Sequence, residues 1–188
     1  MDVEPSLSEN QLAALSARID RPIVLVGMMG VGKTSLGKKL ATLLGLPFTD
    51  ADHEIELAAK MPIPEMFETY GEAYFRDGER RVIARLIDGT PRIIATGGGA
   101  FCHQQTRALI LNKAIAVWLD ADIATLVARV SRKGNRPLLK QGNPRETLVR
   151  LKTERQAAYA QAPIHVISDE GPHGQTVEMV LKALDSWL

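Results

Sequence analysis

Short apolar runs alternate along the chain with segments whose apolar residues recur every three or four positions. The runs are too short for helices and several are rich in β-branched residues, so we expect strands at 23–26, 46–49, 92–96, 114–119 and 164–167. The segments between the runs follow the helical period. This alternation predicts a three-layer α/β fold, in which a five-stranded parallel sheet is covered by helices on both faces.

Helices are expected between these strands and near both ends of the chain. The predicted ranges are 8–19, 35–44, 52–60, 65–70, 72–88, 104–111, 123–130, 144–160 and 175–188. Residues 8–11 have the pattern of a capping box at the start of the first helix. Pro62 and Pro64 interrupt the chain before the fourth helix, and Gly71 separates the fourth helix from the fifth.

One polar segment follows neither pattern. Residues 131–143 are basic and contain glycine and proline, which is typical of a mobile loop, and we expect this loop to act as a lid. Residues 1–20 are interpreted as an N-terminal extension that carries a short helix, and residues 21–188 as a single domain. No internal repeat and no linker to a second domain is visible in the sequence.

Composition narrows the class of protein. The chain has 188 residues, 45% of them hydrophobic and 24% charged, which is ordinary for one globular domain. The net charge of +1 gives no strong field for nucleic acid or an acidic membrane. No apolar run approaches the roughly 18 residues of a membrane span. Cys102 is the one cysteine, so an internal disulfide is impossible, and we expect a cytoplasmic protein.

The segment after the first strand matches the P-loop pattern GxxxxGK[ST]. It reads GMMGVGKTS at 27–35 and lies between a predicted buried strand and a helix, as a phosphate-binding loop requires. Lys33 can reach the β- and γ-phosphates of a bound nucleotide, and Thr34 can place its hydroxyl on Mg²⁺. The expected nucleotide contacts are Gly30, Val31, Gly32, Lys33, Thr34 and Ser35.

The P-loop by itself predicts a nucleotide but no reaction, because GTPases, motors and small-molecule kinases share it. The chain is small for a motor and has no run that resembles the Asn-Lys-x-Asp guanine reader of GTPases. A compact kinase is therefore the leading class, and the acceptor site must lie elsewhere in the chain.

Two carboxylates follow the second strand. Asp50 and Asp52 would project to the same side if the chain stays extended, and would face the P-loop at the carboxyl edge of the sheet. We assign Asp50 to the metal and Asp52 to a substrate hydroxyl. The alternative is that Asp52 caps the next helix. Asp120 ends the fourth strand and is a competing metal ligand, although Asp120 or Asp122 is better explained as a helix cap.

Glycines and arginines supply the remaining candidate contacts. Gly97, Gly98 and Gly99 follow the third strand and would let a ligand lie on the backbone, unless they only form a tight turn. Arg76 and Glu79 share one helix face, so Arg76 either forms a surface ion pair or binds a substrate carboxylate in bidentate fashion.

Two further arginines have similar alternatives. Arg155 has the same two interpretations as Arg76, an ion pair or a substrate contact. Arg136 lies in the predicted lid, where it either closes over the transferring phosphoryl group or remains solvated. The sequence alone does not decide between these alternatives.

Six stretches of the chain together resemble the shikimate kinase family. They read GMMGVGKTSLGKKLA, FTDAD, GEAYFRDGERRVI, TGGGA, NRPLL and ERQAAYAQAP, and they follow the family's order from residue 23 to about 168. The resemblance implies a nucleoside-monophosphate-kinase-like fold with sheet order 2-3-1-4-5. It also implies a monomer that transfers the ATP γ-phosphate to the 3-hydroxyl of shikimate, in the synthesis of chorismate and aromatic amino acids.

The resemblance also implies roles for individual residues. Asp52 would hold the acceptor hydroxyl, and Arg76, Gly98 and Arg155 would bind the carboxylate side of the substrate, with Glu79 orienting that site. The implied catalytic set is Lys33, Asp52 and Arg136.

Contacts to the metal and the nucleotide follow from the same match. Asp50 and Thr34 would serve Mg²⁺, and Arg136 would be the lid arginine. Arg129 would pack on adenine, with residues 168–172 as the other wall. A gluconate-type or nucleoside monophosphate kinase is the alternative enzyme, and a P-loop binding module without turnover is the alternative class.

Overall fold

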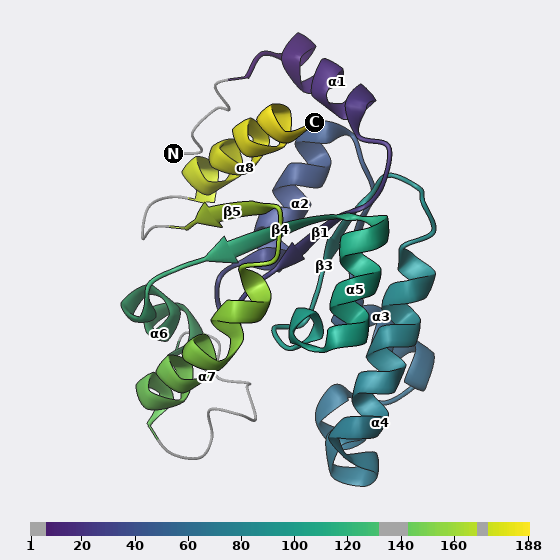
Figure 1. The fold of residues 1–188 in the computed structure, drawn as a ribbon, viewed down its shortest axis with the longest axis vertical. Coiled ribbons are helices and arrows are strands. Elements are labelled where there is room, and N and C mark those ends of the chain that lie inside the picture. Colours follow the sequence, from purple (N-terminus) through teal and green to yellow (C-terminus); the bar gives the residue numbers. More distant parts are fainter. Residues whose placement is uncertain (1–6, 132–142, 169–172) are drawn as a thin grey trace.

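The computed structural model describes residues 7–131, 143–168 and 173–188, which form a five-stranded parallel sheet between helices (Figure 1). The strands are β1 (Ile23–Val26), β2 (Phe48–Asp50), β3 (Ile93–Ala95), β4 (Ile115–Asp120) and β5 (Ile164–Ile167). Their order is β2-β3-β1-β4-β5 and all pairs are parallel. The predicted fold class and strand order are confirmed.

Helices cover both faces of this sheet. They are α1 (Glu9–Arg18), α2 (Lys33–Leu44), α3 (Ala51–Ala59), α4 (Ile63–Leu86), α5 (Gln104–Lys113), α6 (Ile123–Ser131), α7 (Pro144–Tyr159) and α8 (His173–Trp187), with a 3₁₀ turn η1 (Ala100–Cys102). On one side α2 packs against α1 and α8, and on the other α5 packs against α4 and η1 (Figure 1). None of the helices in the described ranges has the length and apolar character needed to cross a bilayer.

The second strand begins two residues later and ends one residue later than predicted. Leu46 was expected to begin it, but the backbone N–H of Leu46 donates to the carbonyl of Ala41 and completes the end of α2. Gly45 adopts the left-handed conformation there, with φ of 63°, as is usual just after a helix. The strand therefore begins at Phe48 and includes Asp50, which brings this carboxylate to the edge of the sheet.

The N-terminal helix α1 is an integral part of the fold. The predicted capping box is present, because Ser8 and Gln11 exchange side-chain and backbone hydrogen bonds. Leu12 and Leu15 are buried in the core that α1 shares with the rest of the chain. The hydroxyl of Ser16 donates to the carbonyl of Leu44 at 2.7 Å, so α1 is attached to the C-terminal end of α2.

Helix α4 is kinked where the sequence predicts a break. Gly71 has φ of 80° and ψ of 174°, which is outside the helical region, and the two helical parts continue on either side of it. The second part ends at Leu86 rather than at Asp88. It carries Arg76 and Glu79 toward the carboxyl edge of the sheet, where the P-loop and the three glycines also lie.

Candidate active site

The P-loop joins β1 to α2 and depends on its glycines. Gly27, Gly30 and Gly32 have φ values of 136°, 82° and 99°, in a region that other residues rarely adopt. A Cβ atom on Gly27 would also overlap the carbonyl of Leu119 in β4. The loop thus holds its shape through backbone conformation and close packing against the neighbouring strand.

Lys33 is the first residue of α2 and is buried within the loop. Its Nζ donates to the carbonyls of Gly27 at 2.8 Å and Met28 at 2.9 Å. The ammonium group is therefore held inside the curve of the P-loop, beside the N-terminus of α2. This arrangement concentrates positive charge where phosphate oxygens would bind.

The side chains of Thr34 in α2 and Asp50 at the end of β2 are in contact. The hydroxyl of Thr34 donates to Oδ2 of Asp50 at 2.8 Å. A hydroxyl and a carboxylate side by side are oxygen ligands that suit Mg²⁺, which commonly takes one or two protein ligands and completes its octahedron with phosphate oxygens and water. No cluster of three or more histidine, cysteine or acidic side chains suited to a metal occurs within the described ranges.

The predicted arrangement of Asp50 and Asp52 is wrong. The chain does not stay extended after Asp50, because α3 begins at Ala51. Asp50 is the N-cap of that helix, and its Oδ1 accepts a hydrogen bond from the N–H of Asp52 at 3.1 Å. The cap is therefore Asp50 rather than Asp52, and Asp52 reaches the site from the first turn of α3.

Asp52 and Glu79 both lie against Gly97. A Cβ atom on Gly97 would be 2.8 Å from Oδ1 of Asp52 and 3.3 Å from Oε1 of Glu79, so a side chain there would displace one or both carboxylates. Burial raises the pKa of Glu79, the charge of Asp52 adds to the rise, and the guanidinium of Arg76 opposes it. The three glycines are thus more than a tight turn, since they leave room for charged side chains above the backbone.

Arg76 and Glu79 do not form a surface ion pair. The Nη1 atom of Arg76 lies 2.8 Å from Oε2 of Glu79, whose side chain is only 1% exposed. A Cβ atom on Gly99 would be 2.8 Å from the same Nη1 atom. Glu79 therefore fixes the guanidinium over the glycine loop, and Glu72 makes a longer contact of 3.3 Å from the other side.

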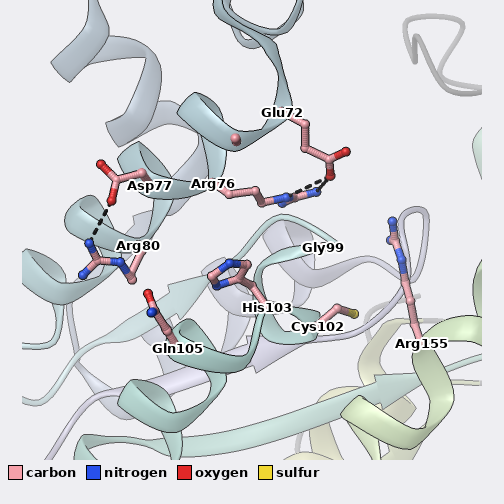
Figure 2. Close-up of a pocket in the computed structure, with 10 residues that line it drawn as sticks. Glu72, Arg76, Asp77, Arg80, Gly99, Cys102, His103, Gln105 and Arg155 are labelled. Atoms are coloured by element: carbon pink, nitrogen blue, oxygen red, sulfur yellow. Dashed lines mark hydrogen bonds and ion pairs between the residues drawn. The ribbon is translucent and has the colours of Figure 1, made fainter.

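Arg155 approaches the same loop from α7. Its Nη1 atom would be 3.3 Å from a Cβ atom on Gly98. Arg76 from α4 and Arg155 from α7 line one pocket of about 630 Å³, with Gly99 and Cys102 between them (Figure 2). Burial raises the pKa of the Cys102 thiol, so this cysteine stays protonated at neutral pH.

Arg129 connects the P-loop to the end of β5. Its Nη1 atom donates to the carbonyl of Val31 at 3.1 Å and to the hydroxyl of Ser168 at 3.2 Å. The predicted adenine wall at 168–172 is described only at Ser168. Arg136 and most of the predicted lid lie outside the described residues.

The two aspartates after β4 have structural roles. Asp122 accepts a hydrogen bond from the N–H of Thr125 at 2.7 Å, so the expected helix cap is Asp122. Asp120 lies 2.9 Å from Nζ of Lys152 in α7. Asp120 is therefore an ion-pair partner of α7, and Asp50 remains the carboxylate beside Thr34.

Sequence reasoning missed Tyr159. Its hydroxyl donates to the carbonyl of Gly98, in the middle of the glycine loop. Arg80 and His103 were also missed, and they line the same pocket as Arg76 and Arg155. The available signal was helical spacing, because Tyr159 is four residues from Arg155 and Arg80 is four residues from Arg76.

Comparison with known proteins places this chain in a family. The family model described as shikimate kinase matches residues 29–185. The chain belongs to the shikimate kinase family. It is 64% identical to a shikimate kinase from Novosphingobium aromaticivorans over 97% of this chain and 96% of that protein, and 50% identical to one from Rhodopseudomonas palustris over 96% and 89%.

A solved structure of this family agrees in fold. The shikimate kinase from Acinetobacter baumannii in complex with shikimate superimposes with a TM-score of 0.85 at 35% sequence identity, covering 91% of this chain and 97% of that one. The family's fold is therefore shared over nearly the whole chain.

Proposed function

We propose that this protein is a kinase that transfers the γ-phosphate of ATP to the 3-hydroxyl of shikimate, giving shikimate 3-phosphate and ADP. The carrying observation is the glycine loop at 97–99, where Asp52 lies against Gly97, Arg155 against Gly98 and Arg76 against Gly99. Arg76 and Arg155 also line one pocket, and Gly98 lies against the backbone of the P-loop. Membership of the shikimate kinase family supports the same substrate and donor.

The donor half of the reaction is assigned to the P-loop. The N–H groups of residues 30–35 and the N-terminus of α2 would bind the β- and γ-phosphates, and Lys33 would neutralise their charge. Thr34 and Asp50 would hold Mg²⁺, which supplies charge neutralisation at the phosphates when it is bound. Arg129 and Ser168 would contact the adenine side of the nucleotide.

The acceptor half is assigned to the pocket. A carboxylate-bearing alicyclic alcohol has one anionic group, which two guanidinium groups can bind with paired N–H donors. Arg76 is already oriented by Glu79, so little side-chain freedom would be lost when the substrate binds. The backbone of Gly97, Gly98 and Gly99 would form the floor beneath the ring.

Asp52 is proposed to orient the acceptor hydroxyl for in-line attack. A carboxylate is a weak base, but phosphoryl transfer through a loose transition state needs little proton removal before attack. Catalysis then depends on positioning and on neutralising charge, to which Lys33 and Arg136 of the lid would contribute. A cytoplasmic, monomeric enzyme of chorismate synthesis is the setting that we propose.

One assay tests the proposal directly. ADP release is measured with ATP and Mg²⁺ in the presence of shikimate, gluconate, AMP or CMP, with an ATP-only reaction as the baseline. We expect turnover with shikimate alone. The proposal fails if shikimate gives no rate above the ATP-only baseline, and turnover of gluconate or a nucleotide in its place would support the alternative kinases.

A further inference from the structure

Helix α7 sends two side chains to the glycine loop. Arg155 and Tyr159 are four residues apart, so they lie on one face of the helix, and both end at Gly98. The Nη1 atom of Arg155 would be 3.3 Å from a Cβ atom on Gly98, while the hydroxyl of Tyr159 donates to the Gly98 carbonyl. The proposed substrate contact and the support of the pocket floor therefore come from the same helical turn.

The hydrogen bond from Tyr159 fixes one peptide plane. The Gly98–Gly99 peptide is planar and trans, so a carbonyl directed at Tyr159 leaves the N–H of Gly99 directed the opposite way. Within the described ranges, this N–H donates no backbone hydrogen bond. Glycine makes such a peptide easy to rotate, because no Cβ atom restricts either residue, and a fixed donor here requires an outside contact.

Tyr159 is itself held rigidly. Its ring is 1% exposed and stacks on Trp118 of β4, with ring centroids 5.9 Å apart. Trp118 in turn stacks on His165 of β5, at 3.8 Å and an interplanar angle of 8°. Burial raises the pKa of the Tyr159 hydroxyl, so it remains a protonated donor across the working pH range. The orientation of the Gly98 carbonyl is thus tied to the central sheet.

We propose that Tyr159 is a positioning residue for the acceptor site, which holds the Gly98–Gly99 peptide in the orientation that receives the substrate. The proposal rests on the assignment of this pocket to shikimate. It differs from a purely structural role, in which the ring only fills the core between α7 and β4. The two roles separate in Tyr159→Phe, because this change keeps the ring and its stacking and removes only the hydroxyl. The hydroxyl also interacts with Arg155 and Cys102, so the mobility of the glycine loop is measured beside KM.

The experiment compares wild type, Tyr159→Phe and a matched control, Tyr70→Phe, in which the same atom is removed from a side chain that is 53% exposed. Steady-state KM values are measured for shikimate and for ATP, with the thermal midpoint as a check of folding. In Tyr159→Phe we expect the KM for shikimate to rise about five- to tenfold and that for ATP to stay within about twofold. Tyr70→Phe should match wild type in both. Equal changes in both KM values, or an unchanged KM for shikimate, would overturn the proposal.

A second measurement does not depend on turnover. Hydrogen exchange is followed in the peptide that covers residues 96–103, without any substrate. Loss of the Tyr159 hydroxyl should speed exchange there severalfold and leave segments of α2 unchanged, and equal rates in wild type and variant would refute the positioning role. If wild type fails to phosphorylate shikimate, the proposed function fails, while the exchange rates still decide whether Tyr159 fixes the glycine loop.

Discussion

The hydroxyl of Thr34 and the carboxylate of Asp50 are joined by a hydrogen bond of 2.8 Å, although they belong to different helix–strand units. Thr34 is in the first turn of the helix that follows the P-loop, and Asp50 is the N-cap of α3. The contact joins the helix after the P-loop to the start of α3, which carries Asp52 of the proposed acceptor half. It also puts the two oxygen atoms that we propose as Mg²⁺ ligands side by side.

Asp50→Asn tests the metal assignment without removing the helix cap, because asparagine caps helices as well as aspartate does. We expect the Mg²⁺ concentration for half-maximal rate to rise roughly tenfold or more. The thermal midpoint should change little. Asp20→Asn, at a side chain that is 64% exposed, is the control. Superimposable Mg²⁺ titrations of wild type and Asp50→Asn would remove Asp50 from the metal site.

Asp52→Asn tests the orientation of the acceptor hydroxyl. Loss of a positioned carboxylate typically lowers turnover by about 10²- to 10⁴-fold, and we expect kcat to fall within that range. Binding of ATP, measured by calorimetry without shikimate, should remain within about twofold of wild type, because Asp52 lies outside the P-loop. A variant with normal kcat would exclude Asp52 from the reaction.

Arg76→Lys separates charge from geometry. Lysine keeps the positive charge but lacks the fork that pairs with a carboxylate, and it would leave Glu79 with a poorer partner in a buried position. We expect the KM for shikimate to rise about tenfold or more, at little cost to the KM for ATP. Arg81→Lys is the matched control, since Arg81 is 63% exposed on the same helix. Equal KM values in the two variants would contradict the carboxylate contact.

The raised pKa of Glu79 predicts that the stability of the folded protein depends on pH. Burial raises its pKa in the folded protein above the ordinary value of 4.5, with Arg76 and Arg155 opposing the rise and Asp52 adding to it. Between these two pKa values the folded protein binds more protons than the unfolded chain, so stability falls as pH rises.

The test of Glu79 compares the stability of wild type with that of a variant over a range of pH. Free energies of unfolding are determined for wild type and Glu79→Gln between pH 4 and pH 8, and the Glu79→Gln values are subtracted. We expect the free energy of unfolding of wild type, relative to that of Glu79→Gln, to fall as pH rises above 4.5. The slope should be at most about 1.4 kcal/mol per pH unit. A difference that grows in favour of wild type as pH rises would show that the pKa is lowered instead.

Replacing glycine by alanine should have opposite effects on stability at two positions of α4. Gly71→Ala should destabilise the fold by about 1–3 kcal/mol, because its φ of 80° and ψ of 174° are sparsely available to alanine, although no atom lies within 4 Å of the new Cβ. Gly78→Ala, at a position with equally open space and helical geometry, should stabilise by about 0.5–1 kcal/mol. Denaturant unfolding measures both, and a gain of stability in Gly71→Ala would contradict the kink.

Local patterns predicted much of the fold. Four of the five strands begin and end within about one residue of the predicted positions. These strands were recognisable because a parallel strand covered on both faces is a continuous apolar run. The break at Gly71 was also predicted from the sequence, because this glycine lies between two segments with helical periodicity. The strand order came from the resemblance to the family, since local patterns carry no information on which strands pair.

The missing parts of the site depend on contacts that are distant in sequence. Asp50 and Asp52 were placed on the same side of an extended chain, although a helix was predicted from residue 52. Local pattern did not show that Asp50 itself is the N-cap and that α3 begins at Ala51. Tyr159 was missed because its partner, Gly98, is 61 residues away and is a backbone carbonyl. Carbonyl acceptors have no side-chain signature, so only the packed structure reveals them.

The attachment of α1 has a practical consequence for handling the protein. Ser16 binds the end of α2 at Leu44, whereas the phosphates are expected at the other end of α2, about 18 Å away along a helix of 12 residues. A fluorophore or a surface linkage coupled to the exposed side of α1 would therefore move rigidly with the nucleotide-binding helix. Such a probe could follow ATP binding in an immobilised enzyme while leaving the entrance to the acceptor pocket open.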